Sequence, residues 1–320
     1  MAEATLYQSG CAIDYTPDAA ITGGEVLQLK DGRAAVMPVD VDSGALGSAQ
    51  VEGVYKIAKT ANIVILTGGR VYWDHSANTA TYKKVNDRDF YLGRATADAA
   101  AADSYVYVAI NVDPPYDIDI GRDAFLTTLA GTAAAGAFGY PRRMGGAFEF
   151  ELTSTNEAQK VDALTVDGFA KGANAIVEAA FRVISDGSGT AVDVSIGVAN
   201  GTHATDADSI TESVFVHLDA NNANINLESD DGTTEVAATD TTLDYTEGSS
   251  VTSRVEVWFD MRDPADVQIY VNGALALGST VFNVDAATGP FYLLVHVEKT
   301  SSTDTYKLAV DWLRARLGQQ

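Results

Sequence analysis

The chain has 320 residues, 46% of them hydrophobic, and 44 acidic residues against 21 basic ones give a net charge of −23. This length and apolar content suit two packed domains, and no apolar run approaches the roughly 18 residues of a membrane span. So negative a surface repels phosphate backbones, which argues against nucleic acid as a partner.

The first twenty residues show no apolar pattern with the period of a helix. Its first residues, MAEATLYQSG, lack the basic head and apolar stretch of a secretory signal, so synthesis in a cytoplasm is expected. Residues 4–7 are interpreted as an arm or an edge strand. Residues 25–29 and 34–39 then alternate around a turn at Asp31-Gly32. Alternating apolar runs around a turn that tolerates positive φ predict a β-hairpin.

The most regular part of the first half is residues 51–82, with two alternating runs, a Gly-Gly turn and an aromatic strand. Alternation with β-branched and aromatic residues predicts strands rather than a helix. Further strands are expected at residues 90–95 and 104–110, and the Ala- and Asp-rich residues 96–103 are a short helix or a loop. Together these elements predict a small β-barrel.

Four segments of this first third follow one another in a characteristic order. They read GGEVLQLKDGRAAV, VEGVYKIAK, GGRVYWD and DFYLGRATADAAAADSYVYVAI. In this order they resemble the bacteriophage capsid-decoration (cement) family over residues 1–111, and GRVYWD at residues 69–74 is the most specific piece. The resemblance implies an all-β module on the outside of a virus head, typically a trimer, that clamps neighbouring capsid subunits.

Such a clamp needs buried area, edge strands and an arm that is ordered on binding. Tyr72 and Trp73 are adjacent on a strand and point to opposite faces. One is expected in the core and the other exposed or at a subunit interface, where aromatic residues are enriched; alternatively both are covered within the domain. The two arginines of the YPRR segment, Arg142 and Arg143, are expected either to meet an acidic partner or to pair with local carboxylates or water. The contact candidates are Thr5, Leu6, Tyr7, Tyr72, Trp73, Arg142 and Arg143.

The best boundary in the sequence is a Pro- and Asp-rich linker at residues 112–120, because its two consecutive prolines interrupt any strand pairing. It separates a domain at residues 1–111 from one at residues 121–320. In the second domain, residues 175–184 are ambiguous between strand and helix, and their neighbours favour strand. Strands are predicted at residues 148–152, 175–184, 192–198, 213–218, 223–228, 253–261, 266–273, 290–298 and 306–314. Many short strands separated by turn residues predict a β-sandwich of jelly-roll type, so the whole chain is expected to be all-β.

Two segments of this second half carry a further resemblance. They are RVEVWFDMRDPADVQIYVNGALAL and the closing VDWLRAR. They resemble the concanavalin-like (laminin-G-like) sandwich superfamily over about residues 120–318. The resemblance implies a fold, and function does not follow from it.

Catalytic motifs are absent from the sequence. Glycosidases on this fold place several carboxylates on one strand face for acid and nucleophile roles. Glu256 and Asp260 share a face by spacing, but the third carboxylate is missing and Trp258 lies between them. No GxSxG elbow or phosphate-binding loop is present. No catalytic residue is assigned, and a glycoside hydrolase is the remotest of the alternatives.

Metal and cofactor signals are equally weak. Cys11 is the single cysteine, and the histidines at positions 75, 203, 217 and 296 form no HxH or HxxxH pair, so no zinc site is predicted. Calcium is the one cofactor considered, because laminin-G-like sandwiches often bind it at a loop rim. Acidic loops at residues 206–208 and 230–231 offer oxygen ligands, although 44 acids produce such clusters by chance. No cofactor or metal ligand is assigned.

These observations predict a non-enzymatic virion protein that decorates and stabilises the outer surface of a phage capsid. Its expected partners are the major capsid protein and two further copies of itself, and the sandwich projects outward towards neighbours, glycans or the host surface. The alternative is a phage appendage that binds carbohydrate or a host surface through the sandwich.

Overall fold

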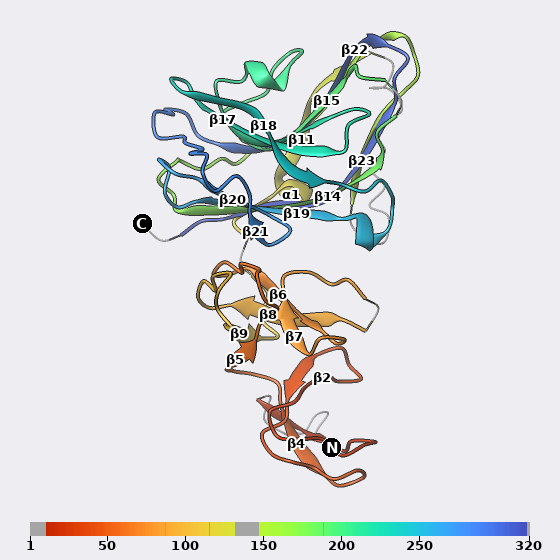
Figure 1. The fold of residues 1–320 in the computed structure, drawn as a ribbon, viewed down its shortest axis with the longest axis vertical. Helices are drawn as coiled ribbons and strands as arrows, with labels where there is room; N and C mark the ends of the chain where they lie inside the picture. The colour runs from red at the N-terminus through yellow and green to blue at the C-terminus, as the bar shows by residue number, and fades with distance from the viewer. Residues whose placement is uncertain (1–10, 87, 115, 132–146, 188, 319–320) are drawn as a thin grey trace, which may run out of the picture. The chain divides into compact units, whose positions relative to one another are not determined.

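The computed structural model describes residues 11–318 except for residues 87, 115, 132–146 and 188. The chain divides into two compact units, Met1–Pro115 and Tyr116–Gln320, and both are built almost entirely of β-strands (Figure 1). No helix among the described residues is long and apolar enough to cross a membrane.

The N-terminal unit contains two antiparallel sheets, ordered β1-β4-β3-β2 and β5-β9-β8-β6-β7. The predicted hairpin is present, since Val26 pairs with Val36 and Gly32 takes a φ of +91° in the turn. The strands are β1 (Ala12–Tyr15), β2 (Val26–Gln28), β3 (Ala34–Val36), β4 (Gly47–Gln50), β5 (Val54–Ala58), β6 (Arg70–Asp74), β7 (Thr79–Thr81), β8 (Phe90–Ala95) and β9 (Tyr105–Ile110).

The five-stranded sheet closes on itself. Lys59, directly after β5, forms a parallel bridge with Ala80 of β7, and the Thr60 amide donates to the Ala80 carbonyl at 2.9 Å. This bridge joins the two ends of the sheet, so the unit is barrel-like as predicted. Residues 96–103 form a loop held by one bridge between Ile65 and Ala99. The buried side chains of the closed sheet include Ile57, Val71, Trp73, Leu92, Val106 and Val108.

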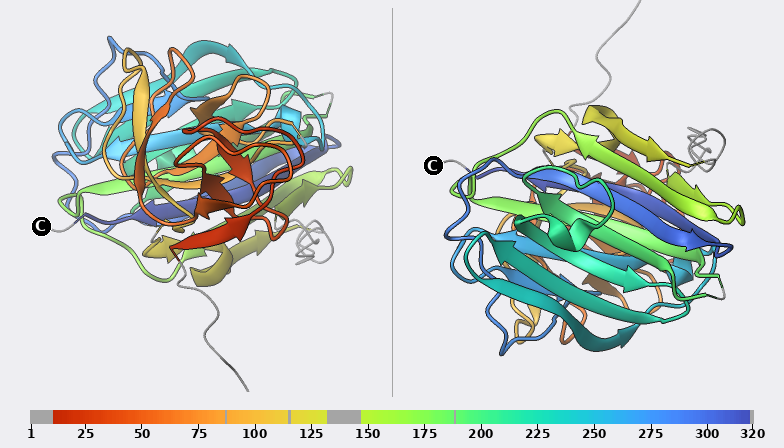
Figure 2. Two further views of the ribbon diagram at one scale, coloured as in Figure 1. Left: turned by 90° about the horizontal axis from the view of Figure 1, so that it is seen from below. Right: turned by 90° about the horizontal axis from the view of Figure 1, so that it is seen from above.

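The C-terminal unit is an all-β sandwich of two seven-stranded sheets, seen from two sides in Figure 2. The β14 sheet has the order β10-β23-β14-β19-β20-β21, with β12 also paired to β23, and the β15 sheet has the order β11-β13-β22-β15-β16-β17-β18. The strands are β10 (Ile118–Asp119), β11 (Ala124–Ala130), β12 (Phe148–Leu152), β13 (Glu157–Thr165), β14 (Ala175–Ser185), β15 (Val192–Ala199), β16 (Glu212–Asp219), β17 (Asn224–Asp231), β18 (Glu235–Asp244), β19 (Val255–Met261), β20 (Gln268–Val271), β21 (Ala274–Leu275), β22 (Tyr292–Ser302) and β23 (Tyr306–Arg316); the short helices are α1 (Ile120–Asp123), η1 (Ala207–Ser209) and η2 (Val251–Ser253).

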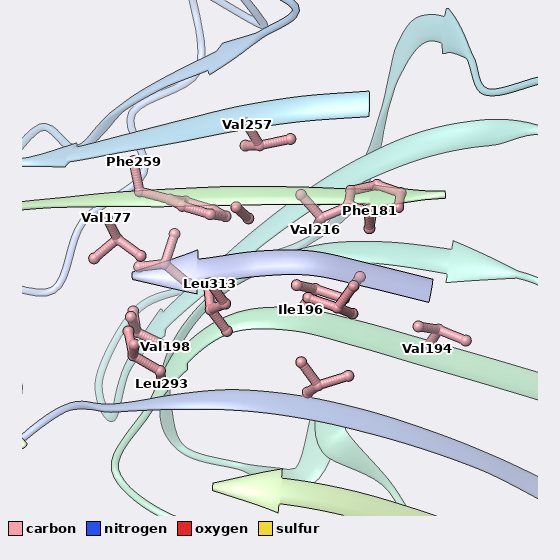
Figure 3. Close-up of a cluster of buried hydrophobic side chains, with 14 of the residues drawn as sticks. Val177, Phe181, Val194, Ile196, Val198, Val216, Val257, Phe259, Leu293 and Leu313 are labelled. Atoms are coloured by element: carbon pink, nitrogen blue, oxygen red, sulfur yellow. The ribbon is translucent and has the colours of Figure 1, made fainter. Parts of the chain in front are cut away.

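The core of the sandwich lies between the two sheets. Figure 3 shows part of it, with valines and isoleucine of β15 facing aromatic and branched side chains of the β14 sheet. Because side chains alternate along a strand, Val194, Ile196 and Val198 point into the core and Asp193 and Ser195 point to the outer face. The outer face of the β15 sheet therefore carries polar groups, among them Asp193 and Ser195.

The sandwich begins inside the segment predicted as a linker. Strand β10 pairs with β23, and Ile118 and Ile120 are buried in the sandwich core. Residues 118–120 thus belong to the folded C-terminal unit, whereas the expected linker ran over residues 112–120. The segment 175–184 is a strand, β14, and its partners β19 and β23 flank it on both sides.

Candidate functional site

The N-terminal unit places the aromatic pair of the GRVYWD segment on opposite faces of β6. Trp73 is buried, and Tyr72 is partly exposed. The Tyr72 ring packs edge-on against Tyr91, with centroids 5.6 Å apart and an interplanar angle of 71°, and the Tyr91 hydroxyl donates to the Val112 carbonyl at 2.6 Å. Tyr72 therefore stays an interface candidate, and Trp73 is a core residue. Of the other candidates, Thr5, Leu6, Tyr7, Arg142 and Arg143 lie outside the described residues.

A second aromatic surface on this unit was not singled out from the sequence. Tyr105 and Tyr107 of β9 are each 49% exposed, and Val54 of the neighbouring β5 is 59% exposed. Lys56 pairs with Tyr107 in the register, and its Nζ lies 4.2 Å from the centroid of the Tyr105 ring. We call Val54, Lys56, Tyr105 and Tyr107 the barrel face. The signal was present in the sequence, because the alternation of YVYV places both tyrosines on one side of a strand.

In the sandwich, two histidines and a serine lie side by side on the outer face of the β15 sheet. Ser195 of β15 pairs with His217 of β16 on one side and with His296 of β22 on the other. All three side chains are buried. Strand alternation thus brings together two histidines that are far apart in the sequence and that no motif connects.

His296 is held between two carboxylates. Its Nδ1 lies 2.7 Å from Oδ1 of Asp162, and its Nε2 lies 3.0 Å from Oε2 of Glu298. Burial lowers the pKa of His296, but the two carboxylates outweigh burial and raise it to about 9. Lys160 lies 3.1 Å from Oδ2 of Asp162, and the Thr202 hydroxyl donates to the same oxygen. Because both ring nitrogens face carboxylates, the imidazole has no free nitrogen with which to activate Ser195.

Four carboxylates surround His217, and we call these five residues the His217 cluster. Its Nε2 lies 3.3 Å from Oδ1 of both Asp193 and Asp219. Its Nδ1 lies 3.3 Å from Oδ1 of Asp208 and 3.4 Å from Oε2 of Glu228. Burial lowers the pKa of His217, but the contacts with Asp208 and Glu228 raise it to about 12. For Asp193, burial raises the pKa to about 7. On each side of the ring, one nitrogen and two carboxylate oxygens lie within 4.8 Å of one another, so either set could hold a metal ion.

A loop between β15 and β16 positions Asp208. The carboxylate of Asp206 accepts a hydrogen bond of 2.9 Å from the Asp208 amide and so caps the short helix η1. Ala207 and Ile210 are buried and anchor the loop on the sheet. They belong to a small apolar cluster with Ala199, Phe215 and Leu294.

A groove on this outer face adjoins the His217 cluster, and a second hollow adjoins the groove. The groove, about 410 Å³ in volume, is lined by Thr190, Ala191, Val192, Asp193, Thr205, Asp206, Asp219, Glu298 and Thr300. A neighbouring hollow of about 260 Å³ shares Thr205, Glu298 and Thr300 with it, and Lys160 lies in its wall. The acidic groups around His217 therefore open into a polar groove.

The carboxylates considered from the sequence do not form a catalytic pair. Glu256 and Asp260 lie on the face of β19 opposite to its core residues, as their spacing indicates, and both are buried. Asp260 pairs with Arg262 at 2.6 Å, and Nε of Arg254 lies 3.5 Å from Oε1 of Glu256. Two buried carboxylates that face arginines are not set up as an acid and a nucleophile on an open cleft.

In the acidic loops considered for calcium, the carboxylates mostly accept hydrogen bonds from nearby backbone amides. Asp230 accepts one from the Gly232 amide at 2.8 Å. Asp231 accepts three, from the amides of Thr233 at 2.8 Å, Thr234 at 2.6 Å and Ala286 at 3.3 Å. Of these loops, only Asp208 joins the His217 cluster.

Comparison with known proteins addresses the N-terminal unit most directly. Residues 7–110 match the family model of the phage cement protein. The resemblance stated for the first third of the chain is thereby confirmed. No curated protein sequence matches the chain.

Similar solved structures cover between about half and two thirds of the chain. The potassium-bound carbohydrate recognition domain of Emp46p is 12% identical, with 62% of this chain and 90% of that chain covered and a TM-score of 0.39. Alginate lyase AlyC3 in complex with dimannuronate is 12% identical, with 58% and 79% covered and a TM-score of 0.41. LamAcat from Zobellia galactanivorans is 12% identical, with 54% and 80% covered and a TM-score of 0.36.

Proposed function

We propose that this chain is a structural virion protein that decorates a phage capsid, with its N-terminal unit bound to the major capsid protein on the outer surface. The match of residues 7–110 to the phage cement protein family carries the proposal. A cement works by covering and joining capsid subunits, for which exposed side chains and open strand edges suffice.

The barrel face is the part of the unit that we assign to the capsid contact. Its two tyrosines are half exposed, and Lys56 stacks on one of them. Half-exposed tyrosines supply large apolar area with a polar tip, which is why they are enriched at interfaces. Tyr72 extends the proposal to β6, and the arm residues Thr5, Leu6 and Tyr7 and the pair Arg142 and Arg143 remain further candidates.

The proposal includes a homotrimer, an outward sandwich and no catalytic activity. The carboxylates that come nearest to a glycosidase pattern, Glu256 and Asp260, are buried beside arginines, which supports a non-enzymatic role. Light scattering coupled to size exclusion tests the trimer, because it should return three times the mass of one chain. A monomer at micromolar concentration would contradict that part.

The decisive experiment is binding of the purified chain to expanded, undecorated heads of its source phage. Co-sedimentation and cryo-electron microscopy should show saturable decoration of the outer surface. A Tyr105→Ala/Tyr107→Ala double variant should bind at least tenfold more weakly, whereas Leu275→Ala, which removes an exposed apolar side chain from the sandwich, should bind as the wild type does. If the wild-type chain leaves the heads bare, the proposal is wrong. If the wild-type chain decorates the heads and the double variant binds equally well, the contact lies elsewhere on the unit.

A second candidate function is glycan binding by the sandwich. The observation that favours it is the polar groove of about 410 Å³, whose carboxylates and threonines can pair with sugar hydroxyls. A glycan array should give consistent hits that Glu298→Gln removes, because Glu298 lines both hollows. An array without hits would leave decoration as the role of the whole chain.

A further inference from the structure

We propose that His217, Asp193 and Asp219 bind a divalent transition-metal ion, of the zinc or manganese class, at the wall of the groove on the β15 sheet. The site goes beyond capsid decoration and uses residues that decoration does not require. His217 would supply Nε2, and each aspartate would supply one oxygen.

The donor atoms have the right separation. Nε2 lies 3.3 Å from an oxygen of each aspartate. Two ligand atoms about 2.1 Å from an ion and 3.3 Å from each other subtend an angle of about 104° at that ion. This angle lies between the octahedral and tetrahedral values. His217 and Asp219 are two residues apart on β16, and Asp193 pairs with Asp219 across to β15, so a rigid scaffold fixes all three.

The cluster also carries buried polar groups with unmet bonding capacity. His217 is 4% exposed, and its Nδ1 has no hydrogen bond of acceptable geometry within the described part of the chain. The same holds for Oε1 of Glu228, which is 7% exposed, and for Oγ of the fully buried Ser195 beside His217. Such groups are rare in folded proteins and call for an explanation. Four carboxylates around one imidazole leave negative charge that a single protonated ring cannot balance.

A cation on the Nε2 side would offset the negative charge and fix the tautomer of His217. With Nε2 bound to the ion, Nδ1 carries the hydrogen and faces Asp208 and Glu228. This is the arrangement in which a carboxylate orients a metal-bound histidine. The cation at the same time balances Asp193 and Asp219.

The surroundings decide which side of the ring takes the ion. Asp193 and Asp219 line the groove of about 410 Å³, which has room for the waters that complete a coordination shell. Asp208 and Glu228 instead line a hollow of about 10 Å³. An imidazole with two carboxylates suits zinc or manganese, whereas calcium takes six to eight oxygen ligands.

Calorimetric titration of the chelator-treated full chain tests the site with zinc, manganese and calcium chlorides. We expect one zinc or manganese ion per chain and at least tenfold weaker calcium binding. His217→Gln and Asp219→Asn should each weaken binding at least tenfold, and Asp208→Asn should weaken it less than Asp219→Asn. The control Asp167→Asn removes an exposed carboxylate away from the groove and should change nothing.

The site is wrong if neither zinc nor manganese gives a saturable heat of binding. It is also wrong if calcium binds more tightly than these two ions, or if Asp219→Asn binds zinc and manganese as tightly as the wild type does. A larger loss of metal affinity in Asp208→Asn than in Asp219→Asn would show that the ion does not bind on the Nε2 side of the ring. Asp219 is a partly exposed side chain, so its variant is informative even if His217→Gln fails to fold, and circular dichroism checks each variant. Electron paramagnetic resonance of bound manganese provides a second, heat-independent count of ions.

Discussion

The side chain of Asn111 and the backbone of Ala34 are joined by two hydrogen bonds of 2.9 Å, one in each direction. The Ala34 amide donates to Oδ1, and Nδ2 donates to the Ala34 carbonyl. Nδ2 also donates to the Val51 carbonyl at 2.7 Å. Asn111 follows β9 of the closed sheet and Ala34 begins β3 of the other, so one amide group connects the two sheets of the N-terminal unit.

Replacing this amide should destabilise the N-terminal unit. Asn111→Ala leaves three partly buried backbone groups without their partner and places alanine at a φ of +58°. We expect a loss of about 2–4 kcal/mol in the free energy of unfolding. Urea titration measures it, with Asn78→Ala, another asparagine at positive φ, as the control for backbone strain. Equal losses in both variants would assign the effect to strain alone.

Gly93 should tolerate no side chain. It has a φ of +155°, and a Cβ at this position would lie 2.1 Å from the Ala109 carbonyl oxygen in the neighbouring strand β9. Gly93→Ala must therefore push β8 and β9 apart, at a cost of about 3 kcal/mol or more. Gly32→Ala is the matched control, because it also has positive φ but meets no atom within 4 Å. Thermal unfolding with similar shifts for the two variants would contradict the close approach.

Alanine substitutions of the neighbours Tyr72 and Trp73 should affect folding stability and capsid binding differently. Trp73→Ala removes a buried side chain and should cost about 3–5 kcal/mol in unfolding free energy. Tyr72→Ala loses mainly its contact with Tyr91 and should cost about 1 kcal/mol. If β6 takes part in the capsid contact, Tyr72→Ala also weakens binding to phage heads. Denaturant titration and head sedimentation on the same samples check both, and a larger stability loss for Tyr72→Ala would reverse the assignment.

His296 should make the stability of the sandwich depend on pH. Its pKa is about 9 in the folded chain and near 6.5 in the unfolded one, so its contribution is complete below about pH 6.5 and lost as the pH rises through 9. That difference corresponds to about 3 kcal/mol. The stability gap between wild type and His296→Gln should therefore shrink between pH 6 and pH 9.5. Denaturant titrations at both values measure it, with His75→Gln as the control, and a constant gap would show that folding does not raise the pKa of His296.

Most strands could be predicted because their apolar residues alternate. Strands β1, β4, β11, β13 and β18 were not predicted, and for β13 and β18 the reason is their polar content. Strand β13 reads EAQKVDALT and buries Gln159, Lys160 and Asp162; Lys160 and Asp162 lie on the outer face and contact the β15–β16 loop. Strand β18 reads EVAATDTTLD and is largely exposed. A pattern that assumes polar residues face water cannot recognise either strand.

The candidate site could not be predicted from residue spacing, because the order of strands in the sheet brings its residues together. His217 and His296 lie 79 positions apart and become neighbours because β15 pairs with both β16 and β22. No local motif encodes a sheet order that places β22 beside β15. The barrel face differs, since its tyrosines are two residues apart in one strand and could have been found from the sequence alone.

The bridge between Lys59 and Ala80 limits how copies of this protein can associate. The bridge and the Thr60–Ala80 hydrogen bond hold the end of β5 against β7, so at that point the edge of the sheet is covered and cannot pair with a strand from another chain. Within the described residues of this unit, the remaining edges are those of β1 and β2 in the open sheet and the parts of β5 and β7 outside this bridge. Copies packed densely on a capsid would otherwise risk fusing into fibres. The bridge shortens the exposed edges of the closed sheet, and the outer strands of the open sheet are short, with four and three residues.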